Sequence, residues 1–130
     1  MRWVHDANCF LARYTVDPAR RDEFIAAAEE LFDFAAPWYD EGCNFAFQGW
    51  SRDPDQWVAI ASWKNEEILA RLRETPEFRA ITTRMLSCCI RNMTMEEFAG
   101  MNKDRSVFDL YPPGQSDIYL PSGTLRVEFL

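Results

Sequence analysis

Residues 57–69 read WVAIASWKNEEIL, an apolar run followed at once by a polar run that favours a helix. The apolar part, Trp57 to Trp63, is rich in aromatic and β-branched side chains and predicts a strand. Asn65 is a favourable helix N-cap, and the two glutamates after it suit the positive end of the helix dipole. The stretch therefore predicts a strand that passes directly into a helix, with Trp63 at the junction.

Three further elements precede this junction. Residues 8–16 predict a first strand, and the Asp-Pro pair that follows is a typical helix start, because proline needs no N–H partner in the first turn. The helix is expected to reach about Tyr39, since apolar residues recur every three or four positions along it. These residues are Phe24, Ala28, Leu31, Ala35 and Trp38. Residues 43–51 predict the second strand, and a turn at 51–55 leads into the third.

After the junction, Pro76 interrupts or restarts the second helix, and residues 87–95 predict a fourth strand. The resulting order, β-α-β-β-α-β, predicts an α+β, ferredoxin-like fold with antiparallel strands and both helices on one face of the sheet. Apolar residues occupy both faces of the strands, as Phe10 and Leu11 illustrate. Because the helices cover only one face, we expect a second copy of the sheet to cover the other in a homodimer.

Residues 1–99 are expected to form this domain, and residues 100–130 a C-terminal arm. The arm contains a break at residues 111–114, and the alternating pattern near its end predicts a short hairpin. Three placements of the arm stay open: on its own domain, across to the partner subunit, or over the mouth of the pocket. We favour the partner subunit.

The composition argues against several classes of function. The 130-residue chain carries a net charge of −7, which repels nucleic acids and anionic membranes. No apolar stretch approaches the ~20 residues of a membrane span, and the N-terminus lacks the apolar run of a signal peptide. These features predict a cytoplasmic protein without nucleic-acid or membrane partners. The four cysteines lack metal-ligand spacing and are expected to be buried thiols, with Cys88 and Cys89 on opposite faces of a strand.

Four short segments occur in a characteristic order along the chain. They are Val16-Asp17-Pro18, Glu41-Gly42-Cys43, Ala61-Ser62-Trp63-Lys64-Asn65-Glu66-Glu67 and Thr75-Pro76-Glu77-Phe78. In this order they resemble the antibiotic biosynthesis monooxygenase superfamily of small dimeric α+β barrels, over residues 8–97. The resemblance implies a ligand between the sheet and the helices. It also implies the activities of that superfamily: cofactor-independent oxygenation of phenolic polyketides, quinol oxygenation and heme degradation.

The resemblance can be followed residue by residue. The heme-degrading branch carries a strand asparagine and a helix histidine, and these positions fall on Ala12 and Thr82, although Trp63 matches. Cofactor-free oxygenases commonly carry an asparagine four residues before the tryptophan, where this chain has Ala59. The only histidine is His5, and a heme iron needs a proximal ligand such as histidine. We therefore expect no heme, no metal and no other cofactor.

The candidate catalytic residues are Trp63, Tyr14 and Arg71. Trp63 is expected to form a pocket wall beside two small alanines, or else to be a plain core residue. Tyr14 could donate a hydrogen bond to a phenolate or ketone oxygen. Arg71 could stabilise a substrate anion, as could Arg13 or Arg91, although such arginines more often form surface ion pairs. The expected substrate-binding residues are Phe10, Ala12, Phe34, Trp38, Ala59, Ala61, Phe78, Thr82 and Met85.

These features predict a small cofactor-independent monooxygenase that acts on an aromatic or polyketide-type phenolic substrate in secondary metabolism. The pocket would deprotonate a phenol or enol, and the carbanion would pass an electron to O2 behind apolar walls. Two alternatives stay open: a non-oxidative isomerase, cyclase or decarboxylase of the same fold, and a non-catalytic binding protein. An enclosed cavity beside Trp63 with a few convergent polar groups would favour an enzyme.

Overall fold

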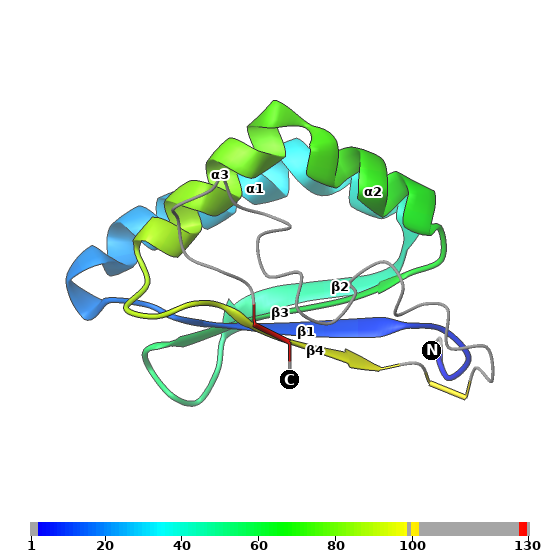
Figure 1. The fold of residues 1–130 in the computed structure, drawn as a ribbon, viewed down its shortest axis with the longest axis horizontal. Coiled ribbons are helices and arrows are strands. Elements are labelled where there is room, and N and C mark those ends of the chain that lie inside the picture. Colours follow the sequence, from blue (N-terminus) through cyan, green and yellow to red (C-terminus); the bar gives the residue numbers. More distant parts are fainter. Residues whose placement is uncertain (1–2, 99, 102–127, 130) are drawn as a thin grey trace.

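One sheet, with helices on one of its faces, forms the body of the protein (Figure 1). The structure is a computed structural model that describes residues 3–98, 100–101 and 128–129. Its strands are β1 (Cys9–Thr15), β2 (Cys43–Trp50), β3 (Gln56–Trp63), β4 (Thr94–Phe98) and β5 (Glu128–Phe129). Its helical segments are η1 (Pro18–Arg20), α1 (Arg21–Gly42), α2 (Glu66–Glu74) and α3 (Pro76–Ser87).

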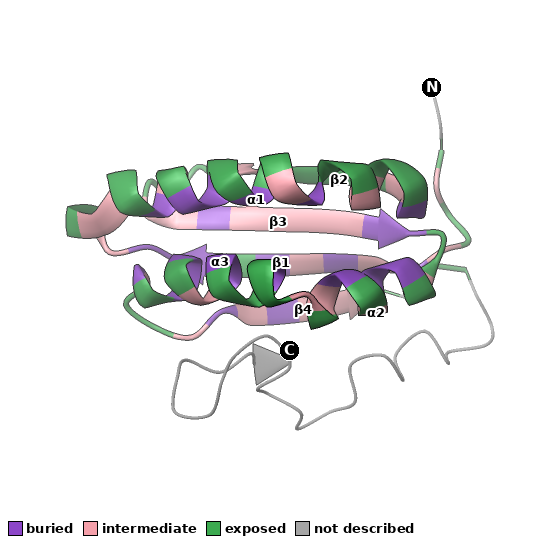
Figure 2. Ribbon diagram, turned by 90° about the horizontal axis from the view of Figure 1, so that it is seen from above, coloured by how far each residue is buried: buried purple, intermediate pink, exposed green. Residues whose placement is uncertain are grey.

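The strand order confirms the predicted ferredoxin-like arrangement. The sheet runs β2-β3-β1-β4-β5, so the first strand lies at its centre. Pairing is antiparallel between β1 and β3, β1 and β4, and β2 and β3, while β5 joins β4 in parallel. Seen from above, α1 runs along the β2 and β3 side, and α3 and α2 follow one another along the β1 and β4 side (Figure 2). The fold is therefore α+β, with two rows of helices over a twisted sheet.

Capping residues explain where the second row of helices begins. The Asn65 side-chain oxygen accepts the backbone N–H of Glu67 at 3.0 Å at the start of α2. The Thr75 hydroxyl accepts the backbone N–H of Phe78 at 3.3 Å, and Pro76 takes the first position of α3. Each such cap is worth about 1 kcal/mol. The second helical row is thus two helices, as the proline in the sequence indicated.

The fourth strand lies further along the chain than the sequence predicted. We expected it at residues 87–95, but α3 extends into that segment and β4 begins only at Thr94. Cys88 is fully buried, and its backbone N–H bonds to the carbonyl oxygen of Met85 at 3.1 Å, so its side chain extends the apolar stripe of the helix. Cys88 and Cys89 therefore lie beyond the end of α3, and the prediction that they occupy opposite faces of a strand is wrong.

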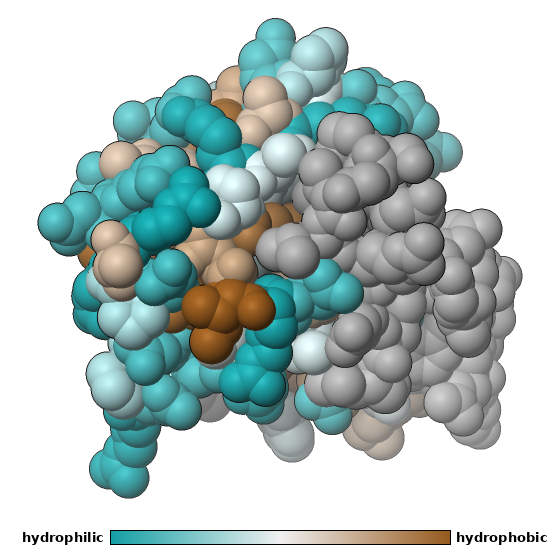
Figure 3. Space-filling model, turned by 60° about the vertical axis from the view of Figure 1, so that its left-hand side comes forward, coloured by the Kyte–Doolittle hydropathy of each residue, from teal (hydrophilic) through white to brown (hydrophobic). Residues whose placement is uncertain are grey.

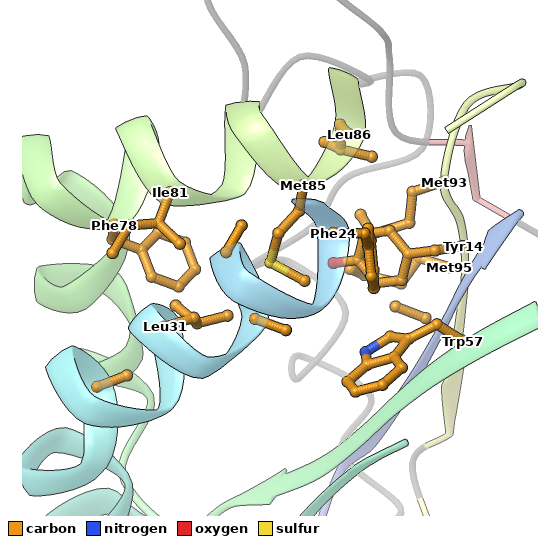
Figure 4. Close-up of a cluster of buried hydrophobic side chains, with 14 of the residues drawn as sticks. Tyr14, Phe24, Leu31, Trp57, Phe78, Ile81, Met85, Leu86, Met93 and Met95 are labelled. Carbon is orange, nitrogen blue, oxygen red and sulfur yellow. The ribbon is translucent and has the colours of Figure 1, made fainter. Parts of the chain in front are cut away.

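The core lies between the sheet and the helices (Figure 4). The ring of Phe24 on α1 meets those of Tyr14 and Trp57 on the sheet edge-on, with centroids 5.7 Å and 5.4 Å apart. Met85 on α3 is fully buried in the same cluster. The predicted stripe on α1 is confirmed, except that Trp38 at its end is only half-buried. This packing holds the helices at a defined height over the sheet.

The outward faces of the helices are exposed (Figure 2), and many of the exposed positions are charged residues. Figure 3 shows one side of the molecule, on which hydrophilic residues surround a small exposed group of hydrophobic ones. Scattered apolar residues of this kind are normal on a protein surface. Among the described residues, no helix is long and apolar enough to cross a membrane.

The face of the sheet that points away from the helices has no described element over it (Figure 1). Phe45 and Phe47 are 41% and 53% exposed there. The predicted homodimer, which would cover this face, stays a prediction. Of the predicted arm, the two residues of β5 pair with β4 of their own chain, while the predicted hairpin otherwise lies outside the described residues.

Candidate active site

A cavity of about 90 Å³ lies between the sheet and the helices, beside Trp63. Strands β1 to β4 and helices α1, α2 and α3 all contribute to its walls. The lining residues are Phe10, Ala12, Tyr14, Leu31, Tyr39, Ala46, Gln48, Ala59, Ile60, Ala61, Trp63, Leu69, Phe78, Thr82, Leu86, Met93 and Met95. The sequence predicted a pocket at this place in the fold, and the structure contains one.

Four alanines on three neighbouring strands form the floor of the cavity. Ala12 is the cross-strand partner of Ala59, and Ala61 is the partner of Ala46. Paired residues of antiparallel strands project to the same face of the sheet. Their four methyl groups leave space under the helices that larger side chains would fill. The floor thus explains why a cavity exists in an otherwise close-packed core.

Trp63 closes one end of this floor. Its side chain is 4% exposed, and its ring lies 5.1 Å from the ring of Tyr39 at the end of α1. Gly42 allows this contact, because a Cβ atom there would lie 2.8 Å from the indole. The sequence left open whether Trp63 is a pocket wall or a plain core residue. It is both, since a buried indole lines the cavity.

A buried amide holds the backbone at the same point. The Trp63 backbone N–H donates to Oδ1 of Asn8 at 3.2 Å, and Nδ2 of Asn8 donates to a carboxylate oxygen of Glu66 at 3.0 Å. Asn8 is 3% exposed. The carbonyl of Gly42 accepts the backbone N–H of Lys64 at 2.9 Å. The ends of β3, α1 and β1 are therefore tied to the start of α2, which fixes the position of the indole.

The polar side chains of the lining are Tyr14, Tyr39, Gln48 and Thr82. The Thr82 hydroxyl donates to the carbonyl oxygen of Phe78 at 2.8 Å, so it can only accept from a ligand. The side-chain oxygen of Gln48 accepts the indole N–H of Trp57 at 3.2 Å. Tyr14 is 8% exposed, as expected for a strand residue that faces the helices. The cavity is thus mainly apolar with a few neutral polar groups.

Most of the predicted site residues come together in this cavity. Those that line it are Trp63, Tyr14, Phe10, Ala12, Ala59, Ala61, Phe78 and Thr82. Phe34 and Trp38 are half-buried on α1 but do not line it, because they lie at the edge of the helix stripe whose centre is Leu31. Met85 is buried in the core between α1 and α3 instead.

The placement of Arg71 at the pocket is wrong. Its side chain is exposed, because the buried face of α2 consists of Ile68, Leu69 and Leu72 and a rotation of about 100° separates successive residues. Arg13 and Arg91 are exposed as well. Among the described residues, no Asp, Glu, His, Lys or Arg lines the cavity. Its chemistry therefore depends on neutral groups.

Some lining residues escaped the sequence analysis, chiefly Gln48 and Tyr39. Gln48 lies on β2 directly opposite Ala59, so the hairpin register could have identified it. Tyr39 lies near the end of α1, where the helix approaches β3. The sequence pattern gives little indication that Tyr39 lines the cavity, because its position depends on how α1 packs against β3.

Glu97 is an ionisable group near this site that the sequence analysis missed. It follows Met95 by two positions on β4 and is the cross-strand partner of Phe10, so it shares their face. Desolvation, and secondarily the nearby charge of Glu66, raise its pKa to about 7, partly offset by Arg73. Its buried oxygen Oε1 has no hydrogen-bond partner among the described residues. Its position follows from the alternation of Met93, Met95 and Glu97, which only the corrected strand reveals.

The cysteines are not activated nucleophiles. Burial raises the pKa values of Cys43 and Cys89 to about 12, so both thiols stay protonated at neutral pH. Within the described residues no group of three or more His, Cys, Asp or Glu side chains could hold a metal ion.

The comparisons with known proteins identify the fold. No protein-family model and no curated sequence matches the chain. A Caulobacter crescentus CB15 structure with the provisional name antibiotic biosynthesis monooxygenase matches 75% of this chain and 92% of its own, with a TM-score of 0.65 and 16% identity. A second structure named antibiotic biosynthesis monooxygenase matches 70% of this chain and 95% of its own, with a TM-score of 0.62 and 16% identity.

A conserved protein from Methanosarcina mazei Go1 has the same arrangement. It matches 72% of this chain and 92% of its own, with a TM-score of 0.64 and 19% identity. At this level of sequence identity, the structural likeness establishes the architecture of the chain and leaves its reaction open. The chain therefore has the ferredoxin-like α+β fold of the structures named as antibiotic biosynthesis monooxygenases.

Proposed function

We propose that the protein is a cofactor-independent oxygenase of a small phenol, quinol or enol. The observation that carries the proposal is the alanine-floored cavity beside Trp63, whose mainly apolar lining includes the polar side chains of Tyr14, Tyr39, Gln48 and Thr82. Such a site binds a flat ligand and shields a reactive intermediate from water. The names of two structures with the same fold support this class of reaction.

The size of the cavity narrows the substrate to a single ring. An engineered cavity of about 150 Å³ holds one benzene molecule, and pockets for larger ligands measure about 300–1,000 Å³. The cavity measures about 90 Å³, so part of a bound substrate must extend out of its open side. A one-ring substrate fits this description, whereas a polycyclic polyketide does not.

The reaction would proceed from the substrate anion. The anion transfers one electron to O2, the two radicals combine to form a C–O bond, and the hydroperoxide loses water to leave a carbonyl. The overall change, R2CH2 + O2 to R2C=O + H2O, needs no further oxidant or reductant. Among the described residues, the lining contains no carboxylate, histidine or amine, so the substrate would lose its proton to solvent. The rate should therefore follow the ionisation of the substrate itself.

The same absence of a charged base also favours a second candidate, a non-catalytic binding protein. General bases and acids typically contribute about 10²–10⁴-fold to a rate. A pocket that only binds a neutral ring needs no general acid or base. The two candidates differ in one measurable respect, the consumption of O2.

The test is a binding screen with one-ring phenols, quinols and β-diketones, followed by oxygen-electrode measurements on the compounds that bind. We expect O2 uptake with one carbonyl product and one water per O2, at a rate that rises with pH through the substrate pKa. Trp63→Phe should lower kcat/KM by about tenfold or more, because the indole wall is lost, which is on the order of 1.4 kcal/mol. Arg71→Ala, which changes an exposed residue outside the cavity, is the matched control and should stay within about twofold.

Circular dichroism melts of both variants separate a loss of fold from a loss of function. A compound that binds in the cavity without O2 uptake at any pH would support the binding protein over the oxygenase. Equal activity of Trp63→Phe and the parent would show that the reaction does not occur beside the indole.

A further inference from the structure

We propose that the Gln48 amide is the donor that recognises the ligand's oxygen atom in this cavity, and that Trp57 holds that amide in the required orientation. The ligands selected in this way are one-ring ketones, enolates and phenolates, which present an acceptor oxygen. The inference deepens the proposed function by naming what the site recognises. Its test measures binding, so it succeeds or fails independently of oxygenation.

The orientation of the amide follows from hydrogen-bond chemistry. The indole N–H of Trp57 lies 3.2 Å from the side-chain oxygen of Gln48. An indole nitrogen donates and never accepts, so the amide must turn its oxygen toward Trp57 and its NH2 group away. The usual ambiguity between amide oxygen and nitrogen is thereby removed. Among the described residues, the NH2 group of Gln48 has no hydrogen-bond partner.

Trp57 is itself held rigidly. It is 6% exposed, and the ring centroids of Phe24 and Trp50 meet it edge-on at 5.4 Å and 5.1 Å. The ring of Phe32 stacks on it at 6.4 Å. The guanidinium of Arg21 lies 3.8 Å from the ring centroid of Trp50, which supports that ring in turn. The indole N–H is therefore a fixed donor, and the amide that it holds is preorganised.

Gln48 lies where a bound ring would meet it. It lines the cavity, and its cross-strand partner is Ala59 of the alanine floor. A ring placed on the floor is adjacent to an amide whose NH2 group needs an acceptor. Solvent reaches this NH2 group in the free protein, so a carbonyl or phenolate oxygen takes the place of a water molecule as its acceptor. In the part of the chain that the structure describes, no positive side chain lines the cavity, so its polar recognition comes from Gln48, Thr82 and the two tyrosine hydroxyls.

A matched pair of probes isolates this hydrogen bond. Acetophenone and α-methylstyrene have nearly the same planar shape, but only acetophenone carries an acceptor oxygen. We expect the full-length protein to bind acetophenone about fivefold to tenfold more tightly, as one net hydrogen bond allows. Affinities are measured by NMR titration of the protein with each probe.

Two substitutions test the two roles. Gln48→Met keeps the length of the side chain and removes the amide, so the preference for acetophenone should fall to within about twofold. Trp57→Phe keeps an aromatic ring and removes the N–H, so the amide can rotate and the preference should fall by about threefold. In the double variant Trp57→Phe should have no further effect on the preference, because the group that it positions is gone.

The other possible results of these titrations would overturn the role proposed for Gln48 or for Trp57. A preference retained in Gln48→Met, or absent from the parent protein, overturns the proposal. Additive effects in the double variant would show that Trp57 acts only through packing. Ala12→Leu fills the floor and should weaken both probes alike. If it does not, while circular dichroism shows an intact fold, the probes bind elsewhere and the proposal is wrong.

Discussion

Glu97 is a single carboxyl group whose ionisation the fold makes less favourable. Its pKa rises from the ordinary value of 4.5 to about 7, mainly through desolvation and then through the charge of Glu66. Between these two values the folded chain binds this proton more tightly than the unfolded chain does. The free energy of unfolding therefore decreases as pH rises from 4.5 to 7, and is constant above that window as far as this group is concerned.

Glu97→Gln should remove this pH dependence. Solvent screening of the partly exposed group reduces the effect to on the order of 1 kcal/mol. The variant should be more stable than the parent at pH 8 and nearly equal to it at pH 4.5, as measured by urea unfolding across the range. Glu74→Gln removes one negative charge from an exposed position and should leave the slope unchanged. If the free energy of unfolding of Glu97→Gln and that of the parent changed with pH in parallel, the raised pKa of Glu97 would be contradicted.

Gly42 lies where α1, β3 and α2 pack closely against one another. It is the last residue of α1, and a Cβ atom there would lie 2.8 Å from the ring of Trp63 and 2.9 Å from the side chain of Ile68 on α2. Both neighbours are buried and cannot move away easily. Gly42→Ala should therefore cost about 1–3 kcal/mol, as overpacking does, and should shift the indole.

Gly49→Ala is the matched control on β2. Its new Cβ would lie 3.2 Å from the ring of Phe47, which is 53% exposed in the single chain and lies on the face of the sheet away from the core. We expect a change within about 0.5 kcal/mol, since the site lies away from the packed core. Urea unfolding gives both free energies, and equal costs for the two variants would show that α1 and β3 do not meet tightly at Trp63.

At the scale of the whole molecule, one face of the sheet has no described element over it (Figure 1). Leu11, Ile60 and Phe47 form one row across β1, β3 and β2. The row ends at Glu96 on β4, the other cross-strand partner of Leu11. Exposed apolar residues rimmed by charged ones are typical of an interaction site. We propose that a second copy of the chain covers this face, with the two sheets back to back.

Phe47→Glu should convert this dimer to a monomer. A charge buried in the interface without a partner weakens association by more than about tenfold, and the exposed position should leave the fold of each subunit intact. Sedimentation velocity over a range of concentrations measures the change. Ile90→Glu places the same charge on an apolar residue that is 64% exposed outside the sheet and should have no effect. A parent protein that sediments as a monomer at all concentrations would disprove the dimer.

The sequence by itself determined the order of the elements and the face that each strand residue occupies. These properties depend on local periodicity, on caps and on the prolines, so Ala12, Ala59, Ala61 and Trp63 could be placed on one side of the sheet in advance. The same reasoning placed the fourth strand too early, because the buried Cys88 continues a helix stripe and strand propensity does not reveal this.

Only the tertiary structure decided which polar and charged side chains reach the cavity and what chemical properties they have there. The exposure of Arg71 depends on the rotation of α2 against the sheet. The orientation of Gln48 depends on the indole of Trp57, which lies nine residues further along the chain on β3. The pKa of Glu97 depends on the burial and the charges brought together around it. Local pattern specifies the side to which a residue points, whereas cavities, amide orientations and carboxyl pKa values depend on distances between segments that only the packed molecule sets.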